Sequence, residues 1–156
     1  MSAAQPKVLV VEDEPAQREV LAYNLEAEGF HVDRAENGDE ALLLVNEAAP
    51  DVIVLDWMLP GVSGIEVCRR LKAMPETQDI PTIVYCNRPV SSEELTRGYE
   101  AGADAYLSKA EMPVLDHIVR VKVREKARID DLAEQNRALE ERARRLIEEQ
   151  QHPYTL

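Results

Sequence analysis

Short apolar segments alternate with helical patterns between Lys7 and about residue 110. Two of these segments, Val8-Leu9-Val10-Val11 and Val52-Ile53-Val54-Leu55, are continuously apolar, which is typical of strands buried on both faces of a parallel sheet. Strands are predicted at about 8–11, 30–35, 52–55, 82–86 and 105–107, the second and the last being more peripheral. Strict alternation of strands and helices predicts an α/β fold with a parallel sheet covered on both faces.

Proline and glycine mark the ends of the predicted helices. Pro15 opens the first helix and Gly29 ends it, whereas Asn37-Gly38 reads as a turn before the second. Pro60-Gly61 and Gly64 form a loop, and the third helix follows it. A fourth helix is predicted over Ser92–Glu100.

The pattern changes after Pro113, because residues 114–151 contain neither glycine nor proline. At ~1.5 Å per residue this stretch predicts a helix of ~55 Å, too long for one small domain, so part of it must project. Six residues recur with heptad spacing, leucines at d and the others at a: Ile129, Leu132, Asn136, Leu139, Ala143 and Leu146. Asn136 at an a position is typical of a parallel two-stranded coiled coil.

The predicted organisation is a compact domain over residues 6–125, a projecting coiled-coil helix over 126–151 and a tail over 152–156. Leu115 and Ile118 fit the heptad frame, but Lys122 and Glu125 interrupt it. The first turns of the long helix are therefore expected to pack on the domain. We favour a homodimer joined by the coiled coil; the alternative is a solitary solvated helix.

Charge is unevenly distributed along the chain. The formal net charge is −12, yet residues 113–156 carry nine basic and nine acidic side chains, so the excess acid lies before them. An acidic surface repels phosphate backbones, and no direct nucleic-acid partner is expected. The two cysteines form no disulfide framework, and there is neither a membrane span nor a signal peptide. We expect a soluble, cytoplasmic protein without a membrane partner.

Acidic residues follow two of the predicted strands. Glu12 and Asp13 close the first strand, Asp56 closes the third, and Lys109 follows the fifth. Ligands of parallel α/β sheets bind at the carboxyl ends of the strands, so these side chains are expected to converge. Three converging carboxylates suit Mg²⁺, which prefers oxygen ligands. The alternative is that each acid is an ordinary solvated residue at a loop edge.

Three segments of the chain resemble the signature segments of response-regulator receiver domains. These segments are Val10-Val11-Glu12-Asp13-Glu14, Asp56-Trp57-Met58-Leu59-Pro60-Gly61-Val62-Ser63-Gly64, and Gly102-Ala103-Asp104-Ala105-Tyr106-Leu107-Ser108-Lys109. The resemblance covers about residues 6–125. It implies a flavodoxin-like, doubly wound sheet of five parallel strands in the order 2-1-3-4-5, and a place in a two-component phosphorelay.

The resemblance also implies a role for each site residue. Asp56 is the expected phosphoacceptor, with Mg²⁺ held by Asp13, Asp56 and the backbone carbonyl of Met58, and by Glu12 through a water. Lys109 is expected to pair with a phosphoryl oxygen. The partner is expected to be a sensor histidine kinase or a histidine phosphotransfer protein, and no independent enzyme activity is expected beyond the domain's own phosphoryl transfer and slow dephosphorylation.

The chain departs from the family pattern at two positions. Cys86, followed by Asn87, occupies the expected phosphoryl-contacting position where the family has threonine or serine, and a thiol is a weak donor. Cys86 is interpreted as a buried filler, with a redox sensor as the alternative. This puts in question the inward swing of Tyr106, the family's switch residue. Ala110 replaces the proline after Lys109, so this peptide bond is expected to be trans.

Three alternatives to a stand-alone phosphoacceptor remain. The domain could be a degenerate receiver that serves as a phosphate-independent docking module. It could also be the front of a longer regulator whose enzymatic output domain follows the coiled coil. A haloacid-dehalogenase-type phosphatase is disfavoured, because it needs a second carboxylate where this chain has Met58.

Overall fold

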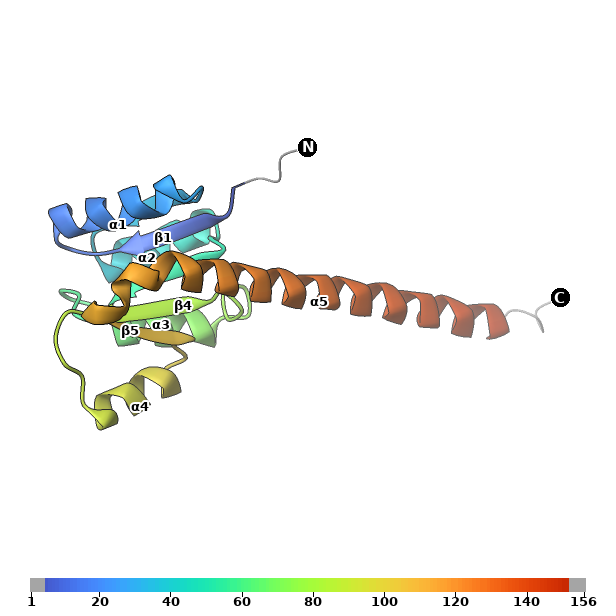
Figure 1. Ribbon diagram of the computed structural model, residues 1–156. Coiled ribbons are helices and arrows are strands. Elements are labelled where there is room, and N and C mark those ends of the chain that lie inside the picture. The colour runs from blue at the N-terminus through green and yellow to red at the C-terminus, as the bar shows by residue number, and fades with distance from the viewer. Residues whose placement is uncertain (1–4, 152–156) are drawn as a thin grey trace. The chain divides into compact units, whose positions relative to one another are not determined.

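A computed structural model describes residues 5–151, apart from the side chain of Lys109. Five parallel strands form one sheet in the order β2-β1-β3-β4-β5, which confirms the predicted fold class (Figure 1). The strands are β1 (Lys7–Val11), β2 (His31–Ala35), β3 (Val52–Asp56), β4 (Thr82–Cys86) and β5 (Ala105–Ser108). The helices are α1 (Pro15–Ala27), α2 (Gly38–Glu47), α3 (Gly64–Ala73), α4 (Ser92–Glu100), the 3₁₀ helix η1 (Lys109–Val114) and α5 (Leu115–Gln151).

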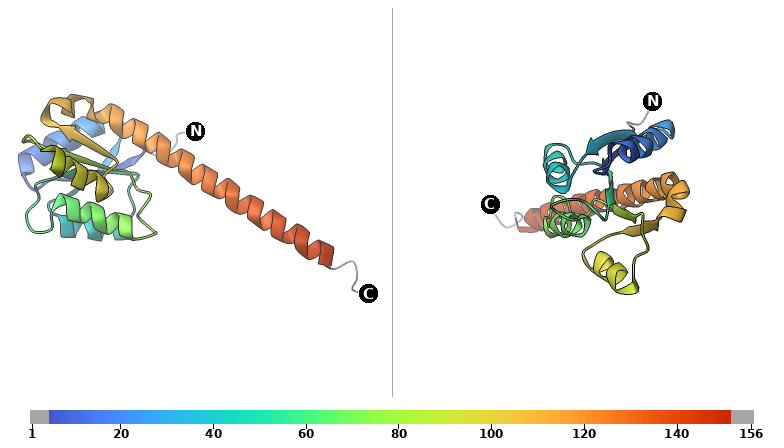
Figure 2. Two further views of the ribbon diagram at one scale, coloured as in Figure 1. Left: turned by 90° about the horizontal axis from the view of Figure 1, so that it is seen from below. Right: turned by 90° about the vertical axis from the view of Figure 1, so that its left-hand side faces the viewer.

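Helices cover both faces of the sheet, as the two views in Figure 2 also show. Alternate residues of the central strands divide between two apolar clusters, with Val54 in one and Leu55 in the other. The cluster that contains Val54 packs against α1 and the start of α5. The cluster that contains Leu55 packs against α2 and α3. Both faces of β3 are therefore buried, which explains its continuous apolar sequence.

Capping residues fix where the helices begin. Glu14 caps α1 by accepting from the backbone N–H of Gln17, and the helix starts at Pro15 as predicted. The prediction of a turn at Asn37-Gly38 is wrong, because these two residues begin a helix. Asn37 is the N-cap of α2 and accepts from the backbone N–H of Glu40, while Gly38 is the first residue of the helix. Asparagine favours both settings, since its side chain mimics a backbone acceptor.

The first turns of α5 pack on the sheet, as the interrupted heptad frame predicted. Leu115 and Val119 are buried in the same cluster as Val54. Arg120 donates to the carboxylate of Glu28 at 2.8 Å and lies over the Phe30 ring, 5.6 Å from its centroid. The 3₁₀ helix η1, which leads into α5, was not predicted.

The chain divides into two compact units between Val123 and Arg124. The N-terminal unit (described residues 5–123) contains the sheet and its helices. The C-terminal unit (residues 124–151) is entirely helical. All of its apolar side chains are exposed, Leu132 at 58% and Leu139 at 64% among them. No helix within residues 5–151 is both long and apolar enough to span a membrane. The predicted domain boundaries stay a prediction.

Candidate metal centre

The sheet brings three carboxylates together at the carboxyl edge of its two central strands. β1 and β3 pair in parallel with Val11 opposite Leu55, so the next residues, Glu12 and Asp56, lie at the same level. Carboxylate oxygens of Glu12, Asp13 and Asp56 lie within 4.8 Å of one another. The predicted convergence of these acids is therefore present in the structure. Glu12 and Asp56 are buried, whereas Asp13 is exposed.

The backbone around Asp56 holds its carboxylate in place. Asp56 is the last residue of β3, is only 6% exposed, and accepts from the Met58 N–H at 3.0 Å through Oδ1. The loop returns so closely that a Cβ atom on Gly64 would lie 2.3 Å from the Asp56 carbonyl oxygen. Only glycine fits there, and this close approach lets α3 begin directly beside the acid.

Glu12 is held through both oxygens of its carboxylate. The Tyr85 hydroxyl donates to Oε1 at 2.5 Å, and the Glu14 N–H donates to Oε2 at 3.1 Å. The Arg18 guanidinium donates to the Glu12 carbonyl oxygen at 2.9 Å. The Glu12 side chain, 1% exposed, is thus fully buried and oriented.

Burial makes the charge of these acids unfavourable. Burial raises the pKa of Glu12 to about 7, with a further rise from the negative charge of Asp56, against the lowering effect of the bonds from Tyr85 and Glu14. Burial also raises the pKa of Asp56, and the Met58 N–H opposes this rise. A cluster of carboxylates that is short of positive charge fits a hard divalent cation such as Mg²⁺. Glu12, Asp13 and Asp56 are the side chains that could hold it.

Two further predicted residues, Cys86 of β4 and Tyr106 of β5, line the same cavity. Cys86, the last residue of β4, is 1% exposed, and it lines a cavity of about 400 Å³ together with Tyr106. The Tyr106 ring is partly buried and meets the Trp57 ring edge to face, with centroids 6.0 Å apart. Trp57 directly follows Asp56 in the chain and packs against the cluster of Leu55.

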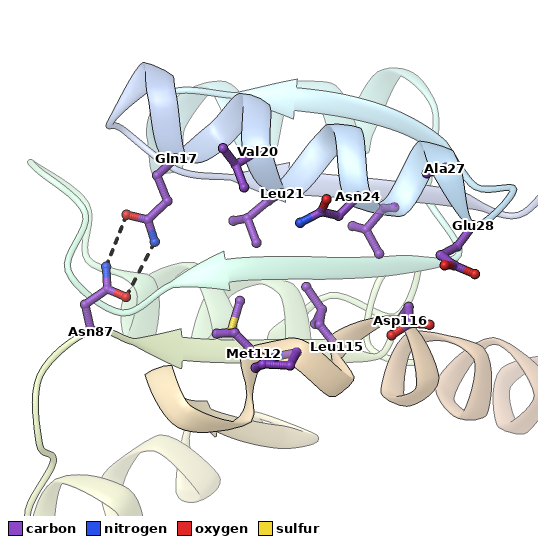
Figure 3. Close-up of a pocket in the computed structure, with 12 residues that line it drawn as sticks. Gln17, Val20, Leu21, Asn24, Ala27, Glu28, Asn87, Met112, Leu115 and Asp116 are labelled. Carbon is purple, nitrogen blue, oxygen red and sulfur yellow. Dashed lines mark hydrogen bonds between the residues drawn. The ribbon is translucent and has the colours of Figure 1, made fainter.

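Asn87 is engaged with α1 rather than with the acid cluster. Its side-chain amide and that of Gln17 exchange two hydrogen bonds of 3.2 and 3.5 Å, as Figure 3 shows. Both residues lie at one end of a largely apolar cleft of about 580 Å³ between α1 and the segment from Met112 to Asp116. None of the three clustered acids lines this cleft.

The predicted phosphoryl contact of Lys109 lies outside the described part of the structure, because its side chain is not described. Its backbone begins η1, directly after β5. Within residues 5–151 there is no cis peptide bond, so the bond before Ala110 is trans, as predicted.

Tyr85 contacts the acid cluster and was not predicted from the sequence. The sequence pattern marks it only as one residue of the apolar fourth strand, yet it is fully buried and bonded to Glu12. Its polar hydroxyl within a strand buried on both faces was the available signal, since a buried tyrosine hydroxyl usually has a partner.

A doubly wound parallel sheet with three acids at its central carboxyl edge defines the class of receiver-type α/β domains. The family model of the response regulator receiver domain matches residues 8–120. The chain belongs to this family and is a receiver domain of two-component signalling.

Known proteins agree with this assignment. The chain is 55% identical over 104 residues to the phosphate regulon transcriptional regulatory protein PhoB of Rhizobium meliloti (strain 1021), a match that covers 67% of this chain and 45% of that protein. It is 42% identical over 120 residues to the transcriptional regulatory protein ResD of Bacillus subtilis (strain 168), covering 76% and 47%. The match thus spans less than half of either regulator.

Solved receiver domains share the fold. The Francisella response regulator 1452 receiver domain is 31% identical with a TM-score of 0.71, and the match covers 78% of this chain and 98% of that one. A CheY-like receiver domain protein of Methanospirillum hungatei JF-1 has a TM-score of 0.73 at 24% identity, which shows the fold alone.

Proposed function

We propose that this domain accepts a phosphoryl group on Asp56 from a histidine kinase or a histidine phosphotransfer protein, with Mg²⁺ at the acid cluster. The observation that supports the proposal most strongly is the convergence of Glu12, Asp13 and Asp56 within 4.8 Å. The Met58 carbonyl and Lys109 complete the proposed site, the first as a further metal ligand and the second as a contact of the phosphoryl group.

For phosphoryl transfer to Asp56, the main task of the protein is to position the reacting groups. An Asp56 carboxylate oxygen attacks phosphorus, the new O–P bond forms as the P–N bond of phosphohistidine breaks, and the imidazole leaves with that electron pair and takes up a proton. The Met58 N–H orients the attacking carboxylate through Oδ1. A bound Mg²⁺ would neutralise phosphoryl oxygens during the transfer. Because the carboxylate is itself the nucleophile, no separate general base is required.

For the output, we propose a parallel homodimer joined by the helix of the C-terminal unit. Support comes from the exposed heptad residues Ile129, Leu132, Asn136, Leu139, Ala143 and Leu146. A phosphate-driven change in the pairing of two receivers would then alter the crossing or register of the two helices. The matched relatives are named as transcriptional regulators. A DNA-binding output is therefore the competing proposal for any longer protein that carries this domain.

The phosphoacceptor is tested by intact-mass spectrometry after incubation with Mg²⁺ and a small phosphodonor. We expect one acid-labile phosphoryl group on the wild type and none on Asp56→Asn. Asp79→Asn is the matched control, because Asp79 is exposed and lies at the other end of β4, before its first residue. A folded wild type that gains no phosphoryl group would favour the phosphate-independent docking module, the alternative that Cys86 and Ala110 keep open.

A further inference from the structure

Tyr85 makes a polar contact that spans the middle of the sheet. It belongs to β4, whereas its partner Glu12 follows β1, and β3 lies between these two strands. Neighbouring strands are ~4.8 Å apart, so the two backbones are separated by roughly 10 Å. A tyrosine is long enough to cover much of that distance, with the glutamate covering the rest.

The register explains how the hydroxyl reaches the acid. Tyr85 pairs with Asp56, and paired residues of parallel strands point to the same face. Tyr85 belongs to the cluster of Val10 and Val54, two residues before Glu12 and Asp56 respectively, so all three side chains lie on that face. The phenol therefore extends over the end of β3, next to the proposed phosphoacceptor, and ends at Glu12.

The buried hydroxyl of Tyr85 donates its hydrogen bond to Glu12. Tyr85 has no exposed surface, and its O–H donates to Glu12 Oε1 at 2.5 Å. The other Glu12 oxygen, Oε2, accepts from the Glu14 N–H. One donor on each oxygen fixes the carboxylate in two directions, and without the phenol one oxygen would lose its donor.

We propose that Tyr85 is a positioning residue that orients the Glu12 carboxylate and thereby sets the Mg²⁺ affinity of the acid cluster. This inference rests on the proposed function, because it takes the cluster to be the Mg²⁺ site. Tyr85 touches neither the metal nor the phosphoryl group in this proposal. Its hydroxyl fixes the direction of one Glu12 oxygen, while the Glu14 N–H fixes the other, so the carboxylate stays aimed at the cluster.

Removal of a hydrogen-bond partner of a metal-site acid typically lowers metal affinity by 10- to 100-fold. We expect about a tenfold loss for Tyr85→Phe, the low end of that range, since Glu12 keeps the bond from the Glu14 N–H. Phenylalanine retains the ring that fills the core, so the fold should persist. Saturating Mg²⁺ should overcome the defect and restore phosphorylation of Asp56 to near the wild-type rate.

The experiment is a Mg²⁺ titration of the full chain, followed by the fluorescence of Trp57 and by calorimetry. Trp57 is the only tryptophan and directly follows Asp56. The matched control is Thr77→Val, which removes another buried hydroxyl, one that donates to the Leu71 carbonyl at 2.6 Å and to none of the clustered acids. Tyr85→Phe should weaken Mg²⁺ binding about tenfold, while Thr77→Val should leave it unchanged.

A double-mutant cycle separates action through Glu12 from a general loss of structure. In a Glu12→Ala background, Tyr85→Phe should have no further effect on Mg²⁺ affinity. An equal loss in both backgrounds, an equal loss in Thr77→Val, or unchanged affinity in Tyr85→Phe would each overturn the role of Tyr85 and leave the phosphoacceptor proposal standing. A wild type that fails to bind Mg²⁺ would overturn both.

Discussion

Leucine side chains differ in exposure between the N-terminal unit and the C-terminal unit. Leu55, in β3, has no exposed surface, whereas Leu139, in the C-terminal unit, is 64% exposed. Most leucines of the N-terminal unit pack within their own chain, on one face of the sheet or the other, and Leu43, at 59% exposed, is an exception. Those of the C-terminal unit form a heptad stripe without such partners among residues 124–151. The core of the first unit is thus closed by its own chain, while the stripe of the second is exposed within residues 124–151.

The N-terminal unit contains exposed ion pairs, such as Arg69 with Glu66, but it also contains a buried polar contact. In the N-terminal unit the Tyr85 hydroxyl and the Glu12 carboxylate meet in a buried setting. In the C-terminal unit, ion pairs such as that of Arg145 with Glu141 join residues one turn apart and are exposed to solvent. Such pairs add only ~0.3–0.5 kcal/mol each to a helix. These ion pairs within one helix stabilise the helix but do not determine what it binds.

The largest expected effect is the contrast between Leu55→Ala and Leu139→Ala. Leu55→Ala leaves a cavity in a closed core and should lower the free energy of unfolding by ~2–5 kcal/mol. Leu139→Ala should leave the chemical unfolding of the N-terminal unit unchanged. Urea denaturation followed by Trp57 fluorescence measures both, and equal losses in the two variants would erase the distinction between the units.

The second prediction concerns pH in the absence of metal. The pKa of Glu12 is about 7 in the folded state against an ordinary 4.5, so the folded state binds more protons between these pH values. The free energy of unfolding should therefore fall as pH rises from 4.5 to 7. Glu12→Gln should remove up to about 3 kcal/mol of this loss.

Denaturant titrations with chelator at several pH values between 4.5 and 7.5 test this pH dependence. The exposed acid Glu76 supplies a control, and Glu76→Gln should retain the wild-type slope. A Glu12→Gln variant whose stability depends on pH as steeply as the wild type would contradict the role of burial at Glu12.

The third prediction is the dimer. Burial of one leucine contributes ~1.5–3 kcal/mol, so Leu139→Asp should dissociate a homodimer held by residues 129–147. Light scattering should show that the intact chain is a dimer. The Leu139→Asp variant and a chain that stops near residue 126 should both be monomers. A monomeric intact chain at micromolar concentration would remove the coiled-coil proposal and leave the phosphoacceptor proposal untouched.

The smallest expected effect is that of Asn136→Leu. An asparagine at an a position costs stability in return for a two-stranded register, so leucine there should stabilise the assembly by about 1 kcal/mol per chain. It should also broaden the assembly beyond dimers in sedimentation experiments. A less stable, strictly dimeric variant would argue against Asn136 at the helix interface.

Much of the fold was predictable because local signals and burial agree. β4 and α4 have the predicted bounds, 82–86 and Ser92–Glu100. The capping box of Ser91 and Glu94 explains the start of α4. η1 was missed because Pro113 reads as a break, although a short 3₁₀ turn tolerates it.

The part of the site that lies at the ends of strands could be predicted from the sequence. Glu12, Asp13 and Asp56 each follow an apolar run, and the parallel topology alone brings them together. Tyr85 could not be placed in the same way. Its contact with Glu12 depends on strand order and register across three strands, which no local pattern encodes. The bond between Asn87 and Gln17 is non-local for the same reason.

The most direct test of the proposed function is the location of the phosphoryl group. After incubation with Mg²⁺ and a phosphodonor, the acyl phosphate is trapped by reduction and mapped by tandem mass spectrometry. We expect the modification at Asp56 alone, and we expect its loss when Mg²⁺ is chelated beforehand. A phosphoryl group on any other residue, or equal labelling without Mg²⁺, would contradict the assignment of the acid cluster.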